Sequence, residues 1–209
     1  MTTYNKIDTL FVRDIDGSKK LIEGLFRSEA VEFCKDLVWQ FTEKIDGTNI
    51  RVMWDGHKIT YGGRTERASI PAHLVRKLIE LFGSEETEQL FEQTFGEKEV
   101  IFFGEGYGSK IQNGGLYRSD VSFILFDVMV NGNYQSRDMV EQAAKQFGLE
   151  IVPIILEGTL QEGVEYVKRK PMSTIGKAPM EGLVGRPKVE LQDRCGNRMI
   201  VKIKVRDFA

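Results

Sequence analysis

The stretch Lys44-Ile-Asp-Gly47 comes shortly after a strand-like segment, Trp39 to Phe41, and is the most informative part of the 209-residue sequence. The preceding segment anchors the lysine in a sheet. The glycine allows the backbone to approach a ligand closely. Taken alone, Lys44 is a surface lysine before an Asp-Gly turn, because patterns of four residues often match by chance. The chemistry that this stretch indicates therefore depends on the charged residues found later in the chain.

The pattern of strands and helices around this stretch predicts the fold class. A hairpin is expected at Asp55-Gly56, between two β-rich segments. Helices are expected over Ser28 to Leu37 (weakly), Ala72 to Phe82, Ser84 to Phe95, Ser136 to Phe147, and from the capping box Thr159-Leu-Gln-Glu162 to a point before Pro171. Further strands are expected over Asn49 to Trp54, Glu99 to Phe103, Val121 to Val130, Ile151 to Leu156, Leu183 to Arg186 and Met199 to Val205. Because strands and helices do not alternate regularly, the sequence predicts an α+β fold with mainly antiparallel sheets and flanking helices.

Length and composition favour one sizeable domain over residues 1–209, with residues 1–37 as an N-terminal flank packed on it. The chain is 41% apolar and 29% charged, as expected for a globular protein. The longest apolar stretch, Val121 to Val130, is too short and too polar to cross a membrane, and the first residues lack a secretory signal. We expect a soluble, cytoplasmic monomer. Two cysteines, Cys34 and Cys195, favour reduced thiols over a disulfide framework or a zinc site.

The charge balance does not favour a nucleic-acid ligand by itself. Lysine and arginine total 29 against 31 acidic residues, which gives a net charge of −2, whereas nucleic-acid binders usually carry a basic excess. Basic residues are enriched in the last third of the chain, at Lys168, Arg169, Lys170, Lys177, Arg186, Lys188, Arg194, Arg198, Lys202, Lys204 and Arg206. A solvated basic face explains any one of them equally well.

Four further charged elements come after Lys44-Ile-Asp-Gly47 in a fixed order. They are Phe103-Gly-Glu105, Leu125-Phe-Asp127, Glu181-Gly182 and Lys202-Ile-Lys204. The series resembles motifs I, III, IIIa, IV and V of the covalent nucleotidyltransferases, the superfamily of polynucleotide ligases and RNA capping enzymes, and within it is most similar to ATP-dependent RNA ligases. The resemblance runs from Gln40 to Arg206 and implies a nucleotidyltransferase domain of ligase type.

The resemblance implies that Lys44, Lys202, Lys204 and Glu181 are catalytic. Lys44 would attack the α-phosphorus of ATP, which requires a neutral amine, and nearby cations disfavour its ammonium form. Lys202 and Lys204 alternate with apolar residues, so both face one side of a strand and could meet one triphosphate. The alternative for this pair is ordinary protection of a strand edge.

The resemblance also implies how nucleotide is bound. Glu105, placed by the sequence at a strand end before the glycine-rich turn Gly104 to Gly108, would hold the ribose. Phe126 would stack on the purine. Strict alternation puts Asp127 on the face opposite Phe126, where it would support the site from behind. Glu43 would meet the adenine edge through its main chain.

The resemblance implies further nucleotide and metal ligands. Asn49 stands where DNA ligases usually have arginine and is typical of the RNA ligase branch. Arg64 resembles an arginine near the ribose and the 5′-phosphate, and its guanidinium suits phosphate. Glu105 and Glu181, with Asp127 as a third candidate, would hold Mg²⁺, or Mn²⁺ in its place, together with phosphate oxygens and water.

The function expected from these features is sealing of RNA 3′-hydroxyl and 5′-phosphate ends, for example in RNA repair, through a lysyl-AMP intermediate made from ATP. The chain ends five residues after Lys204, so we expect no C-terminal OB-fold or helical module. The expected partners are RNA ends in a nicked duplex or an RNA/DNA hybrid. The alternatives are a DNA nick ligase, or a nucleotide- or RNA-binding module of the same fold without turnover.

Overall fold

The computed structural model describes residues 3–208, which fold into two compact units. Unit 1 comprises Met1–Tyr4 and Asp46–Val152, and unit 2 comprises Asn5–Ile45 and Pro153–Ala209. Each unit has its own sheet and its own apolar core. Most pairs of described strands are antiparallel. The exceptions are Asp8–Thr9 (β1) with Val201–Lys204 (β13) and Glu150–Ile151 (β10) with Val121–Val130 (β8). The predicted α+β fold with mainly antiparallel sheets is therefore confirmed.

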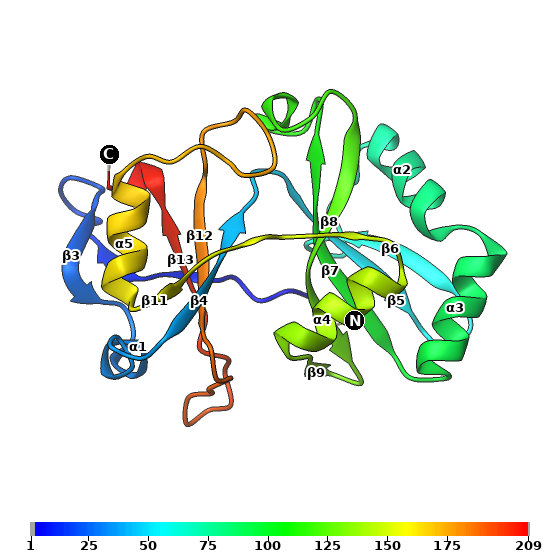
Figure 1. Cartoon of the computed structure of the whole chain (residues 1–209), viewed down its shortest axis with the longest axis horizontal. Helices are drawn as coiled ribbons and strands as arrows, with labels where there is room; N and C mark the ends of the chain where they lie inside the picture. The colour runs from blue at the N-terminus through cyan, green and yellow to red at the C-terminus, as the bar shows by residue number, and fades with distance from the viewer. Residues whose placement is uncertain (1–2, 209) are drawn as a thin grey trace. The chain divides into compact units, whose positions relative to one another are not determined.

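The sheet of unit 1 has the strand order β10-β8-β7-β5-β6, with β9 paired to β8. The strands span Thr48–Trp54 (β5), Ile59–Gly63 (β6), Val100–Gly108 (β7), Val121–Val130 (β8), Asn133–Tyr134 (β9) and Glu150–Ile151 (β10). Helices α2 (Ala72–Phe82), α3 (Glu85–Phe95) and α4 (Arg137–Gln146) and the 3-10 turn η1 (Gly114–Leu116) complete the unit (Figure 1). The hairpin and the three helices confirm the sequence predictions.

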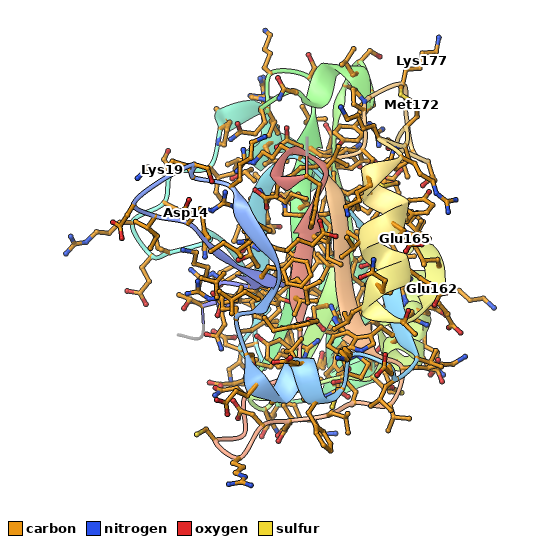
Figure 2. All side chains as sticks on the ribbon, turned by 90° about the vertical axis from the view of Figure 1, so that its left-hand side faces the viewer. Asp14, Lys19, Glu162, Glu165, Met172 and Lys177 are labelled. Carbon is orange, nitrogen blue, oxygen red and sulfur yellow. The ribbon has the colours of Figure 1, made fainter. Side chains whose placement is uncertain are left out.

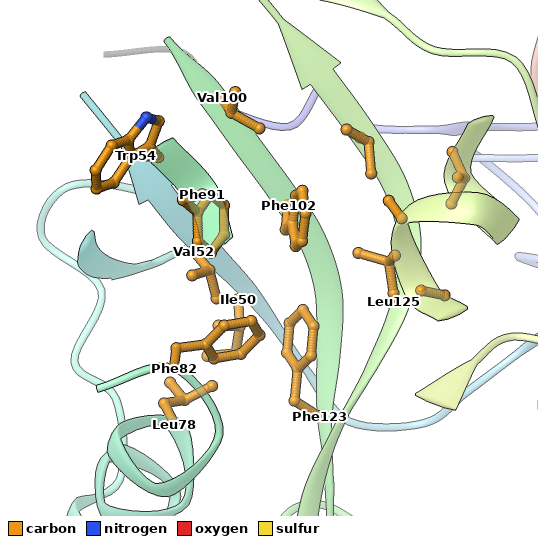
Figure 3. Close-up of a cluster of buried hydrophobic side chains, with 14 of the residues drawn as sticks. Ile50, Val52, Trp54, Leu78, Phe82, Phe91, Val100, Phe102, Phe123 and Leu125 are labelled. Atoms are coloured by element: carbon orange, nitrogen blue, oxygen red, sulfur yellow. The ribbon is translucent and has the colours of Figure 1, made fainter. Parts of the chain in front are cut away.

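The core of unit 1 is rich in aromatic rings. The ring of Phe91 lies 5.1 Å from that of Phe102 and 5.7 Å from that of Trp54, and Phe82 meets Phe123 edge-on at 5.6 Å (Figure 3). Such pairs add stabilisation of about 0.5–1.5 kcal/mol each beyond the burial of apolar area. These contacts fix β5, β7 and β8 as a rigid support.

The glycine-rich segment after Phe103 is strand rather than turn. A Cβ at Gly104 would lie 2.2 Å from the ring of Phe123, and one at Gly106 would lie 2.4 Å from a methyl group of Leu74. Glycine is therefore used here so that core side chains can pack against the strand. The prediction of a turn was wrong, and Glu105 lies inside β7 instead of at a strand end.

The sheet of unit 2 has the order β1-β13-β12-β4-β11, and β2 and β3 form a separate hairpin. The strands span Asp8–Thr9 (β1), Phe11–Arg13 (β2), Leu21–Phe26 (β3), Trp39–Lys44 (β4), Ile154–Gly158 (β11), Gly182–Pro187 (β12) and Val201–Lys204 (β13). Helix α1 (Glu29–Phe33), helix α5 (Leu160–Lys168) and the 3-10 turn η2 (Val205–Asp207) are the remaining elements (Figure 1).

Helix α5 covers one face of this sheet. Val164 and Val167 are fully buried in a core shared with Trp39, Phe41 and Leu183. The predicted capping box is present, with Thr159 and Glu162 bonded reciprocally, and Glu162 and Glu165 lie on the exposed side of the helix (Figure 2). Because α5 buries one face, the opposite face of β4, β12 and β13 is left for polar side chains.

Two local predictions need correction. The expected strand over Ile151 to Leu156 is two strands, β10 and β11, which belong to different units. Pro153 lies between them, and it cannot donate a ladder hydrogen bond. Helix α1 covers only five residues of the expected 28–37 segment.

The structure also bears on two expectations from composition, the absence of a membrane-spanning segment and the reduced state of the cysteines. Within residues 3–208, no helix has the length and apolarity needed to cross a membrane. Cys34 is buried, Cys195 is exposed, and both are free thiols.

Candidate functional site

Three strands of unit 2 bring the motif residues Lys44, Glu181 and Lys204 together. Gly182 of β12 is paired with Lys44 of β4 on one side and with Lys204 of β13 on the other, so the three form a row across the sheet. Glu181 immediately precedes this row. A Cβ on Gly182 would lie 2.2 Å from the carbonyl oxygen of Ile203, so only glycine allows the strands to approach closely here. Gly182 therefore allows the close approach of the three strands, and this places Glu181 next to both lysines.

Glu181 bridges the two lysines. One carboxylate oxygen accepts a hydrogen bond from Lys44 Nζ and the other from Lys204 Nζ, each at 2.6 Å. The side chains are 25%, 16% and 15% exposed for Lys44, Glu181 and Lys204, so water screens these pairs only in part. Burial raises the pKa of the Glu181 carboxyl, but the two ammonium groups outweigh this effect and the net pKa lies below its ordinary value.

Lys202 lies two residues before Lys204 on the same face of β13. It is paired with Val184 and alternates with buried Val201 and Ile203. The predicted shared face of the two lysines is confirmed. Burial lowers the pKa of Lys202, and the charges of Lys204, Lys44 and Lys6 lower it further. Lys44 and Lys204 contact Glu181, while Lys202 is influenced by Lys204, Lys44 and Lys6 and, in the opposite sense, by Asp8, so positive charges outnumber negative ones here.

Glu43 lies on the opposite side of β4 from Lys44. Its side chain is 1% exposed, and its Oε2 accepts hydrogen bonds from the backbone N–H and hydroxyl of Thr174, at 2.9 and 2.6 Å. Thr174 belongs to the loop that precedes Glu181, from which Met172 and Lys177 project (Figure 2). The Glu43 side chain therefore holds this loop against the strand.

In unit 1, the Asp-Gly pair after Lys44 is held by the loop that comes after β7. Asp46 Oδ2 accepts from Asn113 Nδ2 at 3.2 Å, and the Asp46 backbone N–H donates to the hydroxyl of buried Tyr117 at 3.3 Å. A Cβ on Gly47 would lie 2.3 Å from the Gly106 carbonyl oxygen and 2.8 Å from Glu105 Cγ. Glycine thus lets the turn pack directly on Glu105.

Asn49 and Glu105 are neighbours across β5 and β7. They are register partners in the antiparallel ladder, so their side chains leave the same face of the sheet. Asn49 Oδ1 is buried and accepts no hydrogen bond from the described residues. Buried acceptors are rarely left without a donor, so a ligand hydroxyl or water is the natural partner. Arg64 is exposed just beyond the end of β6.

A β-bulge in β8 places Phe126 and Asp127 against one common neighbour. The register jumps from the pair Phe103–Asp127 to the pair Gly104–Leu125, so Phe126 is the extra residue. Tyr4 donates to Asp127 Oδ2 at 2.9 Å, and its ring meets that of Phe126 at 5.0 Å. The prediction of opposite faces was wrong, because strict alternation does not hold across a bulge.

The metal assignments are only partly supported by this geometry. Asp127 is fully buried and accepts from Tyr4, which disfavours direct contact with a metal ion. Among residues 3–208, no three His, Cys, Asp or Glu side chains are grouped to hold a metal. Glu181, a single carboxylate on a positive face, suits an ion held mainly by phosphate oxygens and water.

Sequence reasoning missed the residues that orient the motifs. Asn113 and Tyr117 hold Asp46, Thr174 holds Glu43, and Tyr4 holds Asp127. Of these residues, only Tyr117 could have been noticed in the sequence, because a large aromatic residue directly after Gly114, Gly115 and Leu116 suggests a side chain that anchors a loop. Tyr4 and Thr174 act on residues more than a hundred positions away, and nothing local in the sequence marks such contacts.

Comparison with known proteins identifies the family. The RNA ligase family model matches residues 37–204, which is most of the chain. The chain belongs to the RNA ligase family. The matched range contains all five motifs, and the family is that of ATP-dependent ligases of the nucleotidyltransferase type. A sequence search of curated proteins gave no match.

Solved structures of an RNA ligase from Naegleria gruberi share the fold. The form with ATP and manganese superposes with a TM-score of 0.64 at 20% identity, over 84% of this chain and 51% of that chain. The form with AMP and manganese gives 0.64 at 17% identity, over 95% and 60%. The form with pyrophosphate gives 0.64 at 19% identity, over 96% and 61%. This member of the RNA ligase family therefore spans about half to three fifths of those structures.

Proposed function

We propose that this chain is the nucleotidyltransferase part of an ATP-dependent RNA ligase, with Lys44 as the residue that becomes adenylylated. The observation that carries the proposal is the Lys44–Glu181–Lys204 bridge, in which motif residues distant in sequence meet on one sheet face. Neighbouring structures of the fold were solved with ATP, AMP or pyrophosphate, and the complete sealing reaction consumes ATP and releases the other two.

In the first step, Lys44 Nζ attacks the α-phosphorus of ATP. A P–N bond forms, the bond to the β-phosphate oxygen breaks, and pyrophosphate leaves while the amine loses a proton to solvent. In the structure, Lys44 Nζ lies 2.6 Å from Glu181 Oε2, so the amine is held at the carboxylate before nucleotide binds. Glu181 would hold a divalent cation, which would supply charge neutralisation on the phosphates. Lys204 and Lys202 are placed to stabilise the phosphate charge.

Two further transfers complete sealing. An oxygen of the RNA 5′-phosphate attacks the phosphorus of lysyl-AMP, the P–N bond breaks, and the Lys44 amine regains a proton. The 3′-hydroxyl then attacks the RNA phosphate, and AMP leaves as the phosphodiester forms. Positioning and charge neutralisation supply most of the catalysis in such phosphoryl transfers.

We assign adenosine binding to residues of unit 1. Glu105 and Asn49 would meet the ribose, since they share a face and Asn49 Oδ1 lacks a donor within the described chain. Phe126 would stack on the purine, and Arg64 would meet a phosphate. Glu43 would contribute main-chain contacts only, because its side chain is committed to Thr174. Glu105 is the second carboxylate proposed to assist a metal ion.

Labelling with ATP carrying ³²P at the α-phosphate tests the proposal. We expect a covalent protein–AMP adduct that requires Mg²⁺ or Mn²⁺ and is released by pyrophosphate. Absence of the adduct in the wild type, together with intact nucleotide binding, would favour the alternative of a nucleotide-binding module without turnover.

The preferred substrate is proposed to be a nick in duplex RNA or an RNA/DNA hybrid, with RNA on the 3′-hydroxyl side. A complementary strand would align the two ends, which supplies the proximity that joining of free strands lacks. Contacts to A-form shape and 2′-hydroxyl groups would distinguish RNA from DNA. Sealing assays on matched nicked duplexes, single strands and all-DNA nicks decide this point. Faster sealing of all-DNA nicks would favour the DNA ligase alternative.

A further inference from the structure

Tyr4, the fourth residue of the sequence, belongs to unit 1, although the segment immediately after it belongs to unit 2. Its side chain is 9% exposed, and its hydroxyl donates to Asp127 Oδ2 at 2.9 Å. Asp127 is fully buried on β8, so this hydrogen bond fixes the position of the hydroxyl end of the tyrosine ring.

The ring of Tyr4 is packed by aromatic side chains. It lies 4.9 Å from Phe103, 5.0 Å from Phe126 and 5.9 Å from Tyr134. The contact with Phe126 is edge-on, with an interplanar angle of 70°. This geometry is favourable for aromatic pairs because a positive ring edge meets a negative ring face.

Phe126 needs such support because it is the extra residue of the β-bulge. A bulged residue leaves the regular ladder, and its side chain is redirected relative to its neighbours. Phe126 is only partly buried, whereas the flanking Leu125 and Asp127 are fully buried. The ring of Tyr4 therefore restricts the orientation of a side chain that is still open to a ligand.

We propose that Tyr4 is a positioning residue for nucleotide binding, which acts by holding the ring of Phe126 in the orientation that stacks on the purine. The inference rests on the proposed function in that it takes Phe126 as the stacking residue. A preorganised ring loses less conformational freedom when it binds its ligand. Loss of Tyr4 should accordingly weaken nucleotide affinity and leave the rate at saturating ATP nearly unchanged.

Equilibrium binding of AMP, measured by calorimetry, tests the inference without any chemical step. For Tyr4→Leu we expect the Kd for AMP to rise about 2- to 10-fold, the scale of one aromatic pair. Tyr4→Phe keeps the ring and loses the hydrogen bond to Asp127, so its effect should be smaller. The matched control is Phe95→Leu, which also removes an aromatic ring from unit 1. The ring of Phe95 packs on Phe91 and Phe147 and not on Phe126. This control should therefore leave the Kd for AMP near the wild-type value.

A double-mutant comparison separates positioning from general stability. In a Phe126→Leu background, Tyr4→Leu should cause no further loss of affinity, since the ring it positions is gone. An equal loss in both backgrounds, an equal effect of Phe95→Leu, or an unchanged Kd in Tyr4→Leu would overturn the inference.

Labelling by ATP, run in parallel, keeps the two proposals distinguishable. In Tyr4→Leu we expect the KM for ATP to rise with the Kd while kcat for adduct formation stays close to the wild type. A wild type that binds AMP but forms no adduct contradicts the ligase proposal, and the Kd series still decides the role of Tyr4. A wild type that does not bind AMP at all contradicts the role of Tyr4 as well.

Discussion

The candidate residues Lys44, Glu181 and Lys204 of unit 2 are charged and compensate one another on one face of a sheet, whereas Phe126 and Asp127 of unit 1 are held by an aromatic ring and a hydrogen bond. Lys44 and Lys204 converge on Glu181, while Phe126 and Asp127 are held by Tyr4. Charges that face one another in partly screened surroundings suit the handling of phosphate. Rings and neutral acceptors suit the recognition of a nucleoside.

This contrast leads to different expectations for variants of the two units. Changes in unit 2 should act mainly on the rate of the chemical step, because the groups stabilise charge that develops in the transition state. Changes in unit 1 should act mainly on the affinity for nucleotide. Substitutions at Lys44, Lys204, Asn49 and Glu181 test whether unit 2 governs the rate and unit 1 governs the affinity. The largest effect is expected at Lys44.

Replacing Lys44 removes the proposed nucleophile. Lys44→Ala should abolish the protein–AMP adduct in a labelling gel. Lys44→Arg should fail too, since a guanidinium is never neutral in a protein. Thermal unfolding followed by circular dichroism serves as the control, and should show a folded protein because Lys204 still pairs with Glu181. An adduct in either variant would show that another residue is the nucleophile.

Removing one phosphate-facing lysine should slow adduct formation without abolishing it. We expect Lys204→Ala to reduce the single-turnover rate roughly 10²- to 10³-fold, the scale typical of one charge-stabilising group. Lys202→Ala is the paired variant, and should also lower the rate because Lys202 shares the face. Near-wild-type rates for Lys204→Ala at saturating ATP would mean that the positive face of unit 2 serves binding or stability only.

The alternation of side chains along a strand was predicted correctly from the sequence in β13 and wrongly in β8. The alternation of Lys202 and Lys204 with apolar residues was sufficient to place them on one face, because the period of a strand is two. The same rule failed at Phe126, where a bulge adds one residue. A bulge depends on the partner strand, so a single strand's sequence does not reveal it.

The segment around Glu105 shows a second feature that local sequence does not predict. Its glycines had the composition of a turn, yet they serve to accommodate Phe123 and Leu74 from other elements. The hydrogen bonds from Thr174 to Glu43 and from Tyr4 to Asp127 likewise join positions far apart in the chain. Tertiary packing determines such features, and they cannot be predicted from the composition of a short segment.

A neutral change in unit 1 should alter affinity more than rate. Asn49→Ala removes an amide whose buried oxygen has no donor among the described residues. If a ribose hydroxyl is that donor, the variant loses about one hydrogen bond of 0.5–1.5 kcal/mol, roughly a 2- to 12-fold rise in the KM for ATP. The maximal rate of adduct formation should stay within about twofold. A drop in the maximal rate comparable with that of Lys204→Ala would contradict the division between the units.

A further prediction concerns the stability that Glu181 contributes to the fold and its dependence on pH. The folded-state pKa of Glu181 lies below its ordinary value of about 4.5, because Lys44 and Lys204 together outweigh the effect of burial. A group with a lowered folded pKa stabilises the fold above its unfolded pKa, and this contribution is lost as the pH falls through the folded pKa. Glu181→Gln should therefore be less stable than the wild type at pH 7, by roughly 1.5–3 kcal/mol, as for hydrogen bonds to charged groups.

The difference between the two proteins should shrink below about pH 4.5, because a protonated Glu181 resembles the neutral amide. Urea unfolding at a series of pH values measures it directly. Glu165→Gln is the matched control, since this exposed glutamate of α5 meets only the neutral Gln161 among the described residues, and its effect should be small at every pH. Added salt should reduce the deficit of Glu181→Gln at pH 7, because screening weakens the repulsion left between Lys44 and Lys204. A deficit that is equal at about pH 3 and about pH 7 would show that Glu181 stabilises unit 2 through packing, and that its charge is not what holds the two lysines together.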